Sequence, residues 1–351
     1  MKPKKRIRVL FTIPNFKTAG SQYVVLSLFK GINRDVFDPF ICIEKSPESF
    51  PVEIPEDRRL VFCFDQTFLL NLWEFRKLLH QNDIDIVHSW DYKSNYFEAY
   101  ATRVAGVKYL FTKKNNSWSK RWKLKSILSN HIAYDNPDMR ERFFNSILFK
   151  NKISFIPHGV DTEVFKPLPR KPHESFNLVC IGNICANKNQ LFLIKLLPNL
   201  TENVVLHLYG KEDKEYRKKL EIFINKNNLT SRVYFYGYVE NKSLPEVFRK
   251  MDVFILPSIN EGLPVSILEA LACGIPVLSS DSGGGARYLL DPVYIFSLDD
   301  PKDLCEKINR FQEMKVCENV KIIQGGRQMI CNQYNIEKEI MTYENLYMEI
   351  I

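Results

Sequence analysis

The chain has 351 residues, of which 45% are hydrophobic and 26% are charged. This length suits two domains, and this composition is that of a soluble globular protein, which excludes a disordered or fibrous chain. No run of about 18 apolar residues occurs, so we expect no membrane-spanning helix. The basic and then apolar start of the chain is interrupted by Arg8 and is too short for an export signal, so we interpret it as a first strand.

The net charge of +8 is unevenly distributed. Residues 1–165 carry 26 Lys and Arg against 18 Asp and Glu, whereas residues 166–351 carry 23 of each. A basic half beside a neutral half indicates an anionic partner, which composition alone leaves open between a membrane surface, nucleic acid and a phosphorylated substrate.

The eight cysteines are scattered, with no C-x-x-C pair and no histidine cluster at metal-ligand spacing. We therefore predict reduced thiols, no metal site and a cytoplasmic protein.

Short apolar runs alternate with segments of helical period, and the pattern occurs twice. The expected strands are 7–13, 37–43, 60–64, 84–88, 109–112, 131–134 and 153–156, then 178–182, 204–209, 233–236, 253–256, 276–279 and 293–296. The expected helices are 21–32, 69–80, 94–104, 119–128 and 137–145, then 189–197, 215–225, 244–250, 265–273 and 302–311. Residues 318–351 read as two or three further helices.

Strands without polar alternation, separated by helices, predict an α/β protein with two doubly wound parallel-sheet domains. We expect a first domain at 1–157, a proline-rich linker at 158–175 and a second domain at 176–335. The last helix, about 336–351, is expected to complete the first domain. In such folds ligands bind at the carboxyl ends of the strands.

Three familiar nucleotide or nucleophile motifs are absent: G-x-G-x-x-G, G-x-x-x-x-G-K-[ST] and G-x-S-x-G. Nicotinamide chemistry, P-loop hydrolysis and α/β-hydrolase chemistry therefore lose their usual support.

Residues 257–285 contain the largest group of candidate ligand-binding residues. A strand is followed by Glu261 and Gly262, and Pro264 stands where a helix would begin. Backbone N–H groups of Gly262, Leu263 and Val265 would point out of the helix start, which favours an anion such as a diphosphate.

Glu269 is flanked by apolar residues on this helix. A buried carboxylate needs a polar partner, and a salt bridge or sugar hydroxyls would both serve.

Glu261 and Glu269 in an E-x7-E pattern, followed by ALACGIPV and a glycine loop, resemble the donor site of glycosyltransferase family 4. The segments ISFIPHGVDTEVF (153–165), VCIGNICANKNQ (179–190) and DIVH (85–88) resemble further motifs of that family, so the resemblance covers nearly the whole chain. It implies the GT-B fold, with two Rossmann-like domains facing a central cleft. It also implies retaining transfer of a sugar from a nucleotide-sugar donor, with no cofactor and no metal.

The resemblance implies a role for each matching residue. Glu261 would bind the transferred sugar and Glu269 the ribose, while residues 262–265, including Pro264, would face sugar and phosphate. Lys188 would neutralise the departing diphosphate, and with Glu261 it forms the expected catalytic pair. Gly182 belongs to the same phosphate-binding loop.

Two departures concern the phosphate site. Asn183 stands where the family usually has Arg, and we hypothesise that Arg287, after the glycine loop, restores the missing charge. The loop after the first strand, KTAGSQ, keeps only Gly20 of the usual glycine pair, which still allows close approach to phosphate.

Two departures lie elsewhere. Lys114 and Asn115 occupy a region where many members have His, and they are candidates for contacting sugar, phosphate or acceptor. His158 replaces an Asn between the domains.

In retaining transfer the leaving-group oxygen can take the acceptor proton, so we expect no protein general base. UDP-hexose and GDP-mannose both remain open as donors. We expect a glycan or polyprenyl-diphosphate-linked acceptor in bacterial surface polysaccharide synthesis. A nucleotide-sugar epimerase and a non-catalytic nucleotide-sugar binding module are the alternatives.

Residues 113–125, KKNNSWSKRWKLK, hold six basic residues, with Trp118 and Trp122 four apart. On a helix these rings share one face, which suits either an anionic membrane surface or packing in a core. The first alternative would place the protein peripherally on the inner face of the plasma membrane. No nucleic-acid-binding module accompanies the segment, so we expect no nucleic-acid partner.

Overall fold

The computed structural model describes residues 5–16, 21–44, 50–90, 95–170, 173–281 and 285–351. The chain divides into two compact units. The first comprises Met1–His158 and Ile336–Ile351, and the second comprises Gly159–Asn335. From Gly159 onward, the proline-rich segment that we interpreted as a linker therefore counts with the second unit.

The described part of the first unit forms one seven-stranded sheet in the order β3-β2-β1-β4-β5-β6-β7, with neighbouring strands parallel. Its strands are β1 (Ile7–Ile13), β2 (Phe37–Ile43), β3 (Arg59–Val61), β4 (Ile86–Ser89), β5 (Lys108–Lys113), β6 (His131–Tyr134) and β7 (Ile153–Phe155). Its helices are α1 (Ser21–Gly31), α2 (Phe68–Gln81), α3 (Phe97–Val104), α4 (Lys120–Leu128), α5 (Asp138–Phe143) and α12 (Ile336–Ile350). The edge strand β3 is shorter than predicted, and its Val61 is exposed.

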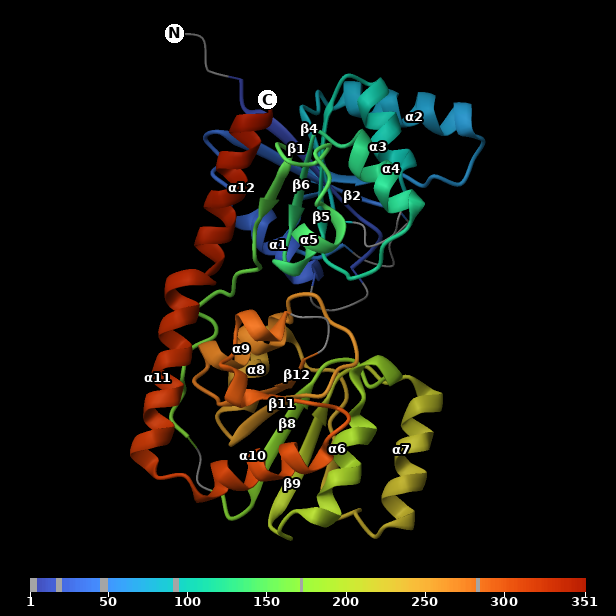
Figure 1. The fold of residues 1–351 in the computed structure, drawn as a ribbon. Coiled ribbons are helices and arrows are strands. Elements are labelled where there is room, and N and C mark those ends of the chain that lie inside the picture. The colour runs from blue at the N-terminus through green and yellow to red at the C-terminus, as the bar shows by residue number, and fades with distance from the viewer. Residues whose placement is uncertain (1–4, 17–20, 45–49, 91–94, 171–172, 282–284) are drawn as a thin grey trace. The chain divides into compact units, whose positions relative to one another are not determined.

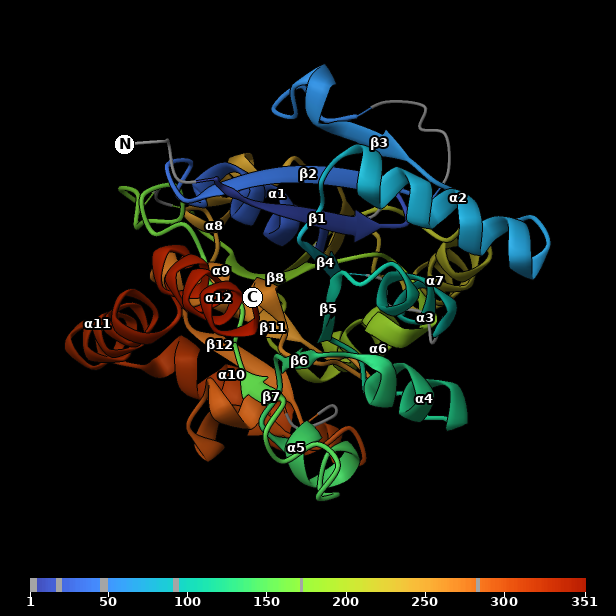
Figure 2. The same cartoon turned by 90° about the horizontal axis from the view of Figure 1, so that it is seen from above.

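Helices cover both faces of this sheet, as the nonalternating strands predicted. Along β1, Val9 and Phe11 pack on the side of α1 and α12, while Leu10 packs on the side of α2, α3 and α4. Figures 1 and 2 show α2, α3 and α4 following one another on that second side. The core therefore forms two apolar layers, one on each side of the sheet.

Helix α12 is held to the first unit by buried polar contacts. His88 on β4 lies 2.6 Å from the Tyr347 hydroxyl and 2.8 Å from Thr112 Oγ1. Thr112 in turn lies 2.9 Å from the hydroxyl of Tyr343. Because buried polar groups are costly without partners, these matched groups specify where α12 packs.

His158, the departure between the domains, lies in the same region. Its Nδ1 is 3.1 Å from Glu339 on α12, and its Nε2 is 3.4 Å from Asp135 after β6. Burial alone would lower the pKa of His158, but hydrogen bonds to the two carboxylates outweigh it and raise the pKa to about 9. The charged imidazole thus joins the C-terminal helix to the end of the first unit's main segment.

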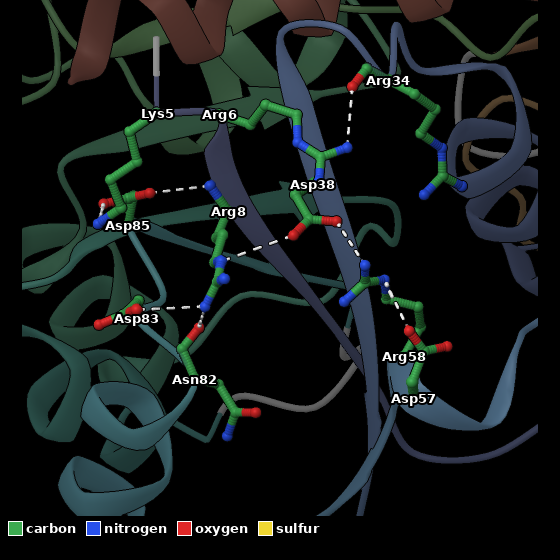
Figure 3. Close-up of polar contacts among 10 residues, drawn as sticks. All are labelled: Lys5, Arg6, Arg8, Arg34, Asp38, Asp57, Arg58, Asn82, Asp83 and Asp85. Carbon is green, nitrogen blue, oxygen red and sulfur yellow. Dashed lines mark hydrogen bonds and ion pairs between the residues drawn. The ribbon is translucent and has the colours of Figure 1, made fainter. Parts of the chain in front are cut away.

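A charged network occupies the amino ends of β1 and β2 (Figure 3). Arg8 pairs with Asp38 at 3.5 Å and with Asp83 at 3.3 Å, and Arg58 pairs with Asp38 at 3.2 Å. Ligands of such sheets bind at the opposite, carboxyl end. We therefore assign this network to the stability of the fold.

The described residues of the second unit form a six-stranded parallel sheet in the order β10-β9-β8-β11-β12-β13. Its strands are β8 (Phe176–Ile181), β9 (Val204–Tyr209), β10 (Val233–Phe235), β11 (Val253–Leu256), β12 (Val277–Ser280) and β13 (Ile295–Phe296). Its helices are α6 (Gln190–Leu196), α7 (Lys214–Lys226), α8 (Leu244–Phe248), α9 (Val265–Ala272), α10 (Pro301–Glu313) and α11 (Val316–Gln333). Strand order reverses between β8 and β11, which is where sheets of this kind bind ligands.

Candidate functional site

The β11–α9 corner of the second unit has the form that the sequence predicted. Pro264 is the residue before α9, with extended backbone, and the helix begins at Val265. It ends at Ala272, and Gly274 follows with a φ of 72°, which favours glycine. Within the described part of the chain, the N–H groups of Gly262, Leu263 and Val265 meet no backbone or side-chain acceptor. Unpaired N–H groups at a helix start favour an anion.

Lys188 and Glu261, distant in sequence, meet at this corner. Lys188 Nζ donates to Glu261 Oε1 over 2.6 Å, and both side chains are partly buried. Their loops are also tied together: Ile259 N donates to Asn187 O at 2.8 Å, and Asn187 Nδ2 donates to Asn260 O at 3.0 Å. A cation and a carboxylate are thus fixed beside the amides of the helix start.

Two glycines allow the loops of this site to approach one another. Gly182 has a φ of 149°, and a Cβ there would lie 3.3 Å from Lys188 Cε. A Cβ on Gly285 would lie 1.7 Å from Gly262 O, which no real side chain could occupy. The last glycine of the predicted glycine loop therefore packs against the Glu261–Gly262 turn.

Glu269 on α9 is buried and accepts a hydrogen bond of 2.6 Å from Asn241 Nδ2. Burial raises the pKa of Glu269 to about 7, and the hydrogen bond from Asn241 opposes this rise. Among the described residues, Glu269 forms no salt bridge, and it does not lie on a solvated face of the helix. Asn241 was not predicted, because it is 28 positions away in a short turn without a recognisable motif.

Asn183 and Arg287, the two altered positions, have different surroundings. Asn183 is exposed, and its carbonyl accepts a hydrogen bond of 3.0 Å from Gln190 Nε2. The Arg287 guanidinium makes a two-pronged contact with Asp281, at 2.8 Å and 3.1 Å. Part of the charge of Arg287 is therefore already matched by a carboxylate.

The remaining candidates belong to the first unit. Lys114 Nζ donates to Trp90 O at 2.7 Å and lies 4.7 Å from the centre of the Trp90 ring. Asn115 accepts hydrogen bonds from Lys113 through both its carbonyl and its side chain. Gly20 lies outside the described residues.

The structure decides between the two alternatives for the tryptophan pair. Trp122 is buried, with its ring centre 5.8 Å from that of Phe111, and Trp118 stacks on Phe143 at 4.9 Å. Trp122 lies in the interior of the first unit and Trp118 is partly buried against the same apolar layer, so the structure favours the core-packing alternative for this pair. Their amphipathic spacing reflects packing against β5 and α5.

Lys113 and Lys125 of the same segment are also buried. Burial lowers the pKa of Lys113 to about 7, with Asp135 opposing the change and Lys125 adding to it. Only part of the basic run, including Lys120, Arg121 and Lys123, is exposed.

None of the described helices combines the length and apolar character needed to cross a bilayer. Among the described residues, no three His, Cys, Asp or Glu side chains gather in a way that could hold a metal ion.

Two family models match the chain. The model of Glycosyltransferase Family 4 matches residues 18–164, and that of Glycosyl transferases group 1 matches residues 161–329. The second match contains Lys188, Glu261 and Glu269.

Relatives of known activity extend these matches. An Escherichia coli UDP-Gal:alpha-D-GlcNAc-diphosphoundecaprenol alpha-1,3-galactosyltransferase is 25% identical over 95% of this chain and 94% of its own length. A GDP-mannose-dependent alpha-(1-6)-phosphatidylinositol monomannoside mannosyltransferase of Mycolicibacterium smegmatis is 30% identical over 43% of this chain and 44% of its own length.

The fold is also shared with solved structures. The crystal structure of Anabaena HepE in complex with UDP superposes with a TM-score of 0.84, covering 98% of this chain and all of that chain at 17% identity. The two Rossmann-like sheets are thus those of the GT-B fold. The chain therefore belongs to the glycosyltransferases of group 1 and family 4, and it is an enzyme of this class with the GT-B fold.

Proposed function

We propose that the protein transfers a hexose from a nucleotide-sugar donor to a hydroxyl of a glycan or lipid-linked acceptor, with retention of configuration. The observation that carries this proposal is the meeting of Lys188 and Glu261 beside the N–H groups of the β11–α9 corner, which meet no acceptor among the described residues. A fixed cation and the N–H groups of a helix start suit a diphosphate, and the neighbouring carboxylate suits sugar hydroxyls.

In this proposal, Lys188 and the amides of residues 262–265 hold the diphosphate. As the bond between the sugar C1 and the diphosphate oxygen breaks, negative charge grows on that oxygen. Lys188 is already in place to stabilise it, without reorganisation at the moment of reaction. This cation lets us propose that the reaction needs no metal ion.

Glu261 would accept hydrogen bonds from the transferred sugar. Its present bond to Lys188 means that the donor must take over both partners, the phosphate pairing with Lys188 and the sugar with Glu261. Both side chains keep some exposure, so such an exchange requires no unfolding of the corner.

Glu269 would accept the two ribose hydroxyls in its buried position on α9. It has a single described hydrogen-bond donor, Asn241, so its oxygens retain accepting capacity. The raised pKa indicates that burial holds this carboxylate at a cost, which hydroxyl donors would reduce.

The proposed step is balanced without a protein base. The acceptor hydroxyl attacks C1 on the face from which the diphosphate departs, a new C1–O bond forms, and the leaving oxygen takes the acceptor proton. The products are the glycosylated acceptor and a nucleoside diphosphate.

We further propose an acceptor carried on a lipid diphosphate, in the assembly of a bacterial surface polysaccharide at the cytoplasmic side of the membrane. The support is a full-length relative named for a diphosphoundecaprenol acceptor, together with the basic first unit. Lys114, at the carboxyl end of β5, is the side chain that we propose for an acceptor phosphate.

The first test is thermal-shift and calorimetric screening with UDP, GDP and their sugars, because a ligand of the native state raises its melting temperature. We expect one nucleotide to bind, and a lysine-to-alanine change at 188 to weaken it. Transfer is then followed with labelled donor and lipid-diphosphate sugar acceptors. Donor binding without turnover on any acceptor would favour the binding module, and interconversion of free nucleotide sugars would favour the epimerase.

A further inference from the structure

Three helices of the first unit form a continuous outer layer. The Phe68 ring of α2 meets Phe97 of α3 edge-on at 4.8 Å and lies 5.8 Å from Tyr100. Arg103 of α3 donates to the carbonyl of Leu128, the last residue of α4, at 3.3 Å. Figures 1 and 2 show the three helices side by side, with α2 reaching outward beyond α3.

Helix α2 carries exposed apolar side chains on the side that faces away from the sheet. Asn71, Phe75 and Leu79 are its buried residues, whereas Leu69 is 75% exposed and Trp73 is 59% exposed. Leu69 and Trp73 are four positions apart and so share one face of the helix. An ordinary surface helix has polar residues there, so this exposed pair needs another explanation.

Exposed apolar and basic side chains also occur on the neighbouring helices. Further exposed apolar side chains of the layer are Leu70, Tyr100, Val104, Leu124 and Ile127. Its exposed basic side chains are Arg76, Lys77, Arg103, Lys120, Arg121 and Lys123. We call these two sets together the α2–α4 face.

The helices of this face carry few acidic residues to offset their basic side chains. Helices α2, α3 and α4 are described throughout, and their acidic residues are Glu74 and Glu98. Glu98 is buried and accepts a hydrogen bond of 2.7 Å from the Tyr109 hydroxyl. The exposed charge on these helices is therefore strongly positive.

We propose that the α2–α4 face docks on an anionic phospholipid bilayer. Leu69 and Trp73 would enter the interface between headgroups and acyl chains, and the basic side chains would lie on the headgroup phosphates. Lys77 Nζ lies 5.2 Å from the Trp73 ring, so its charge is placed beside the inserted indole.

A protein partner fits the same face less well, because the cores of interfaces between proteins are depleted in charged residues, lysine among them. A bilayer matches both properties at once, since it offers an apolar interior beneath a layer of negative charge.

The inference deepens the proposed function and rests on it in one respect: an acceptor anchored in a bilayer requires the enzyme to work at that surface. It also differs from the membrane alternative that the sequence left open for residues 113–125. Trp122 is buried and Trp118 is partly buried against Phe143, so Trp73, outside the basic run, is the proposed anchor instead.

Co-sedimentation of the full chain with vesicles tests the proposal. We expect binding to phosphatidylcholine vesicles containing about one third phosphatidylglycerol, little binding to phosphatidylcholine alone, and weakening by salt. The variant L69Q/W73Q should bind at least about tenfold more weakly, and K120E/K123E should bind more weakly and lose most of the salt dependence.

Matched controls come from α7 of the second unit. Ile222 is 61% exposed, and Lys218 and Lys219 are exposed on the same helix. The controls I222Q and K218E/K219E should bind vesicles as the wild type does. Equal melting temperatures of all variants would show that the changes leave the fold intact.

Two vesicle results would overturn the inference: wild-type binding that does not depend on anionic lipid, or equal binding by L69Q/W73Q. A wild-type dimer that becomes a monomer in L69Q/W73Q would also overturn it, because the face would then be an interface between two copies of the chain. Transfer measured with water-soluble, short-chain lipid-diphosphate sugar acceptors, which need no bilayer, separates the two proposals. Vesicle binding without transfer leaves the docking inference standing and defeats the proposed function, and transfer without vesicle binding does the reverse.

Discussion

The Lys188 ammonium lies 2.6 Å from a carboxylate oxygen of Glu261, although 73 positions separate the two residues. One loop follows β8 and the other follows β11, the strands at which the order of the sheet reverses. The groups proposed for the diphosphate and for the sugar thus neutralise each other in the free protein. Donor binding must therefore separate them.

Replacing Glu261 should separate binding of the nucleotide from transfer of the sugar. We expect E261A to lower turnover by about 10²–10³-fold, because sugar contacts are lost. Its affinity for the free nucleoside diphosphate should equal or exceed that of the wild type, because Lys188 is released. K188A should lower both quantities, and K195A, at an exposed position on α6, should change neither. Parallel loss of nucleotide affinity in E261A and K188A would contradict this division of roles.

The raised pKa of Glu269 predicts pH-dependent donor binding. The carboxyl is protonated below about pH 7 in the free protein and is a carboxylate above it. Since ribose hydroxyls donate to the carboxylate, donor affinity should rise as the pH increases through about 7 and then level off. Calorimetry in buffers of different ionisation enthalpy should show a proton released on binding.

The same titration has two informative variants. E269Q should remove the pH dependence. N241A should move its midpoint upward, because the hydrogen bond from Asn241 lowers the pKa of Glu269. An unchanged profile in E269Q would assign the dependence to another group.

Gly285 should tolerate no side chain. A Cβ would lie 1.7 Å from Gly262 O, so G285A must push apart the two loops that frame Glu261. We expect a loss of roughly 1–3 kcal/mol in stability, measured by denaturant unfolding, and weaker donor binding. G325A is the control, because a Cβ at Gly325 would have nothing within 4 Å. Equal donor affinity of G285A and wild type would show that this contact does not shape the site.

His158 should make the stability of the protein depend on pH. Its pKa of about 9 in the folded state lies above its ordinary value of 6.5, so the charged form stabilises the fold. This stabilisation is complete below about pH 6.5 and is lost as the pH rises through about 9. Comparing melting temperatures of wild type and H158N across this range should show a difference that shrinks with increasing pH. A constant difference would mean that His158 acts by packing alone.

The hypothesis that Arg287 compensates for Asn183 can be tested through its partner. R287A should weaken donor binding. D281A should strengthen it, because the guanidinium would then no longer share its charge with this carboxylate. Unchanged affinity in both variants would defeat the compensation hypothesis.

The sequence predicted the elements of both sheets well, because buried parallel strands and amphipathic helices leave local patterns. It also predicted the β11–α9 corner, since a strand, a proline at the helix start and a glycine at the helix end are adjacent in the chain. The motifs around Glu261 and Glu269 indicated the glycosyltransferase family, which the family matches confirm.

Contacts between distant residues could not be predicted in this way. The pairing of Lys188 with Glu261, the hydrogen bond from Asn241 and the close approach of Gly285 to Gly262 each join separate segments of the second unit. The tryptophan spacing likewise fitted a membrane anchor and a core equally. Helical periodicity defines a face, but only the packing of other elements decides whether that face meets protein or solvent. The sequence by itself thus determined the elements, the corner and the family, while tertiary packing decided which side chains meet and which remain exposed.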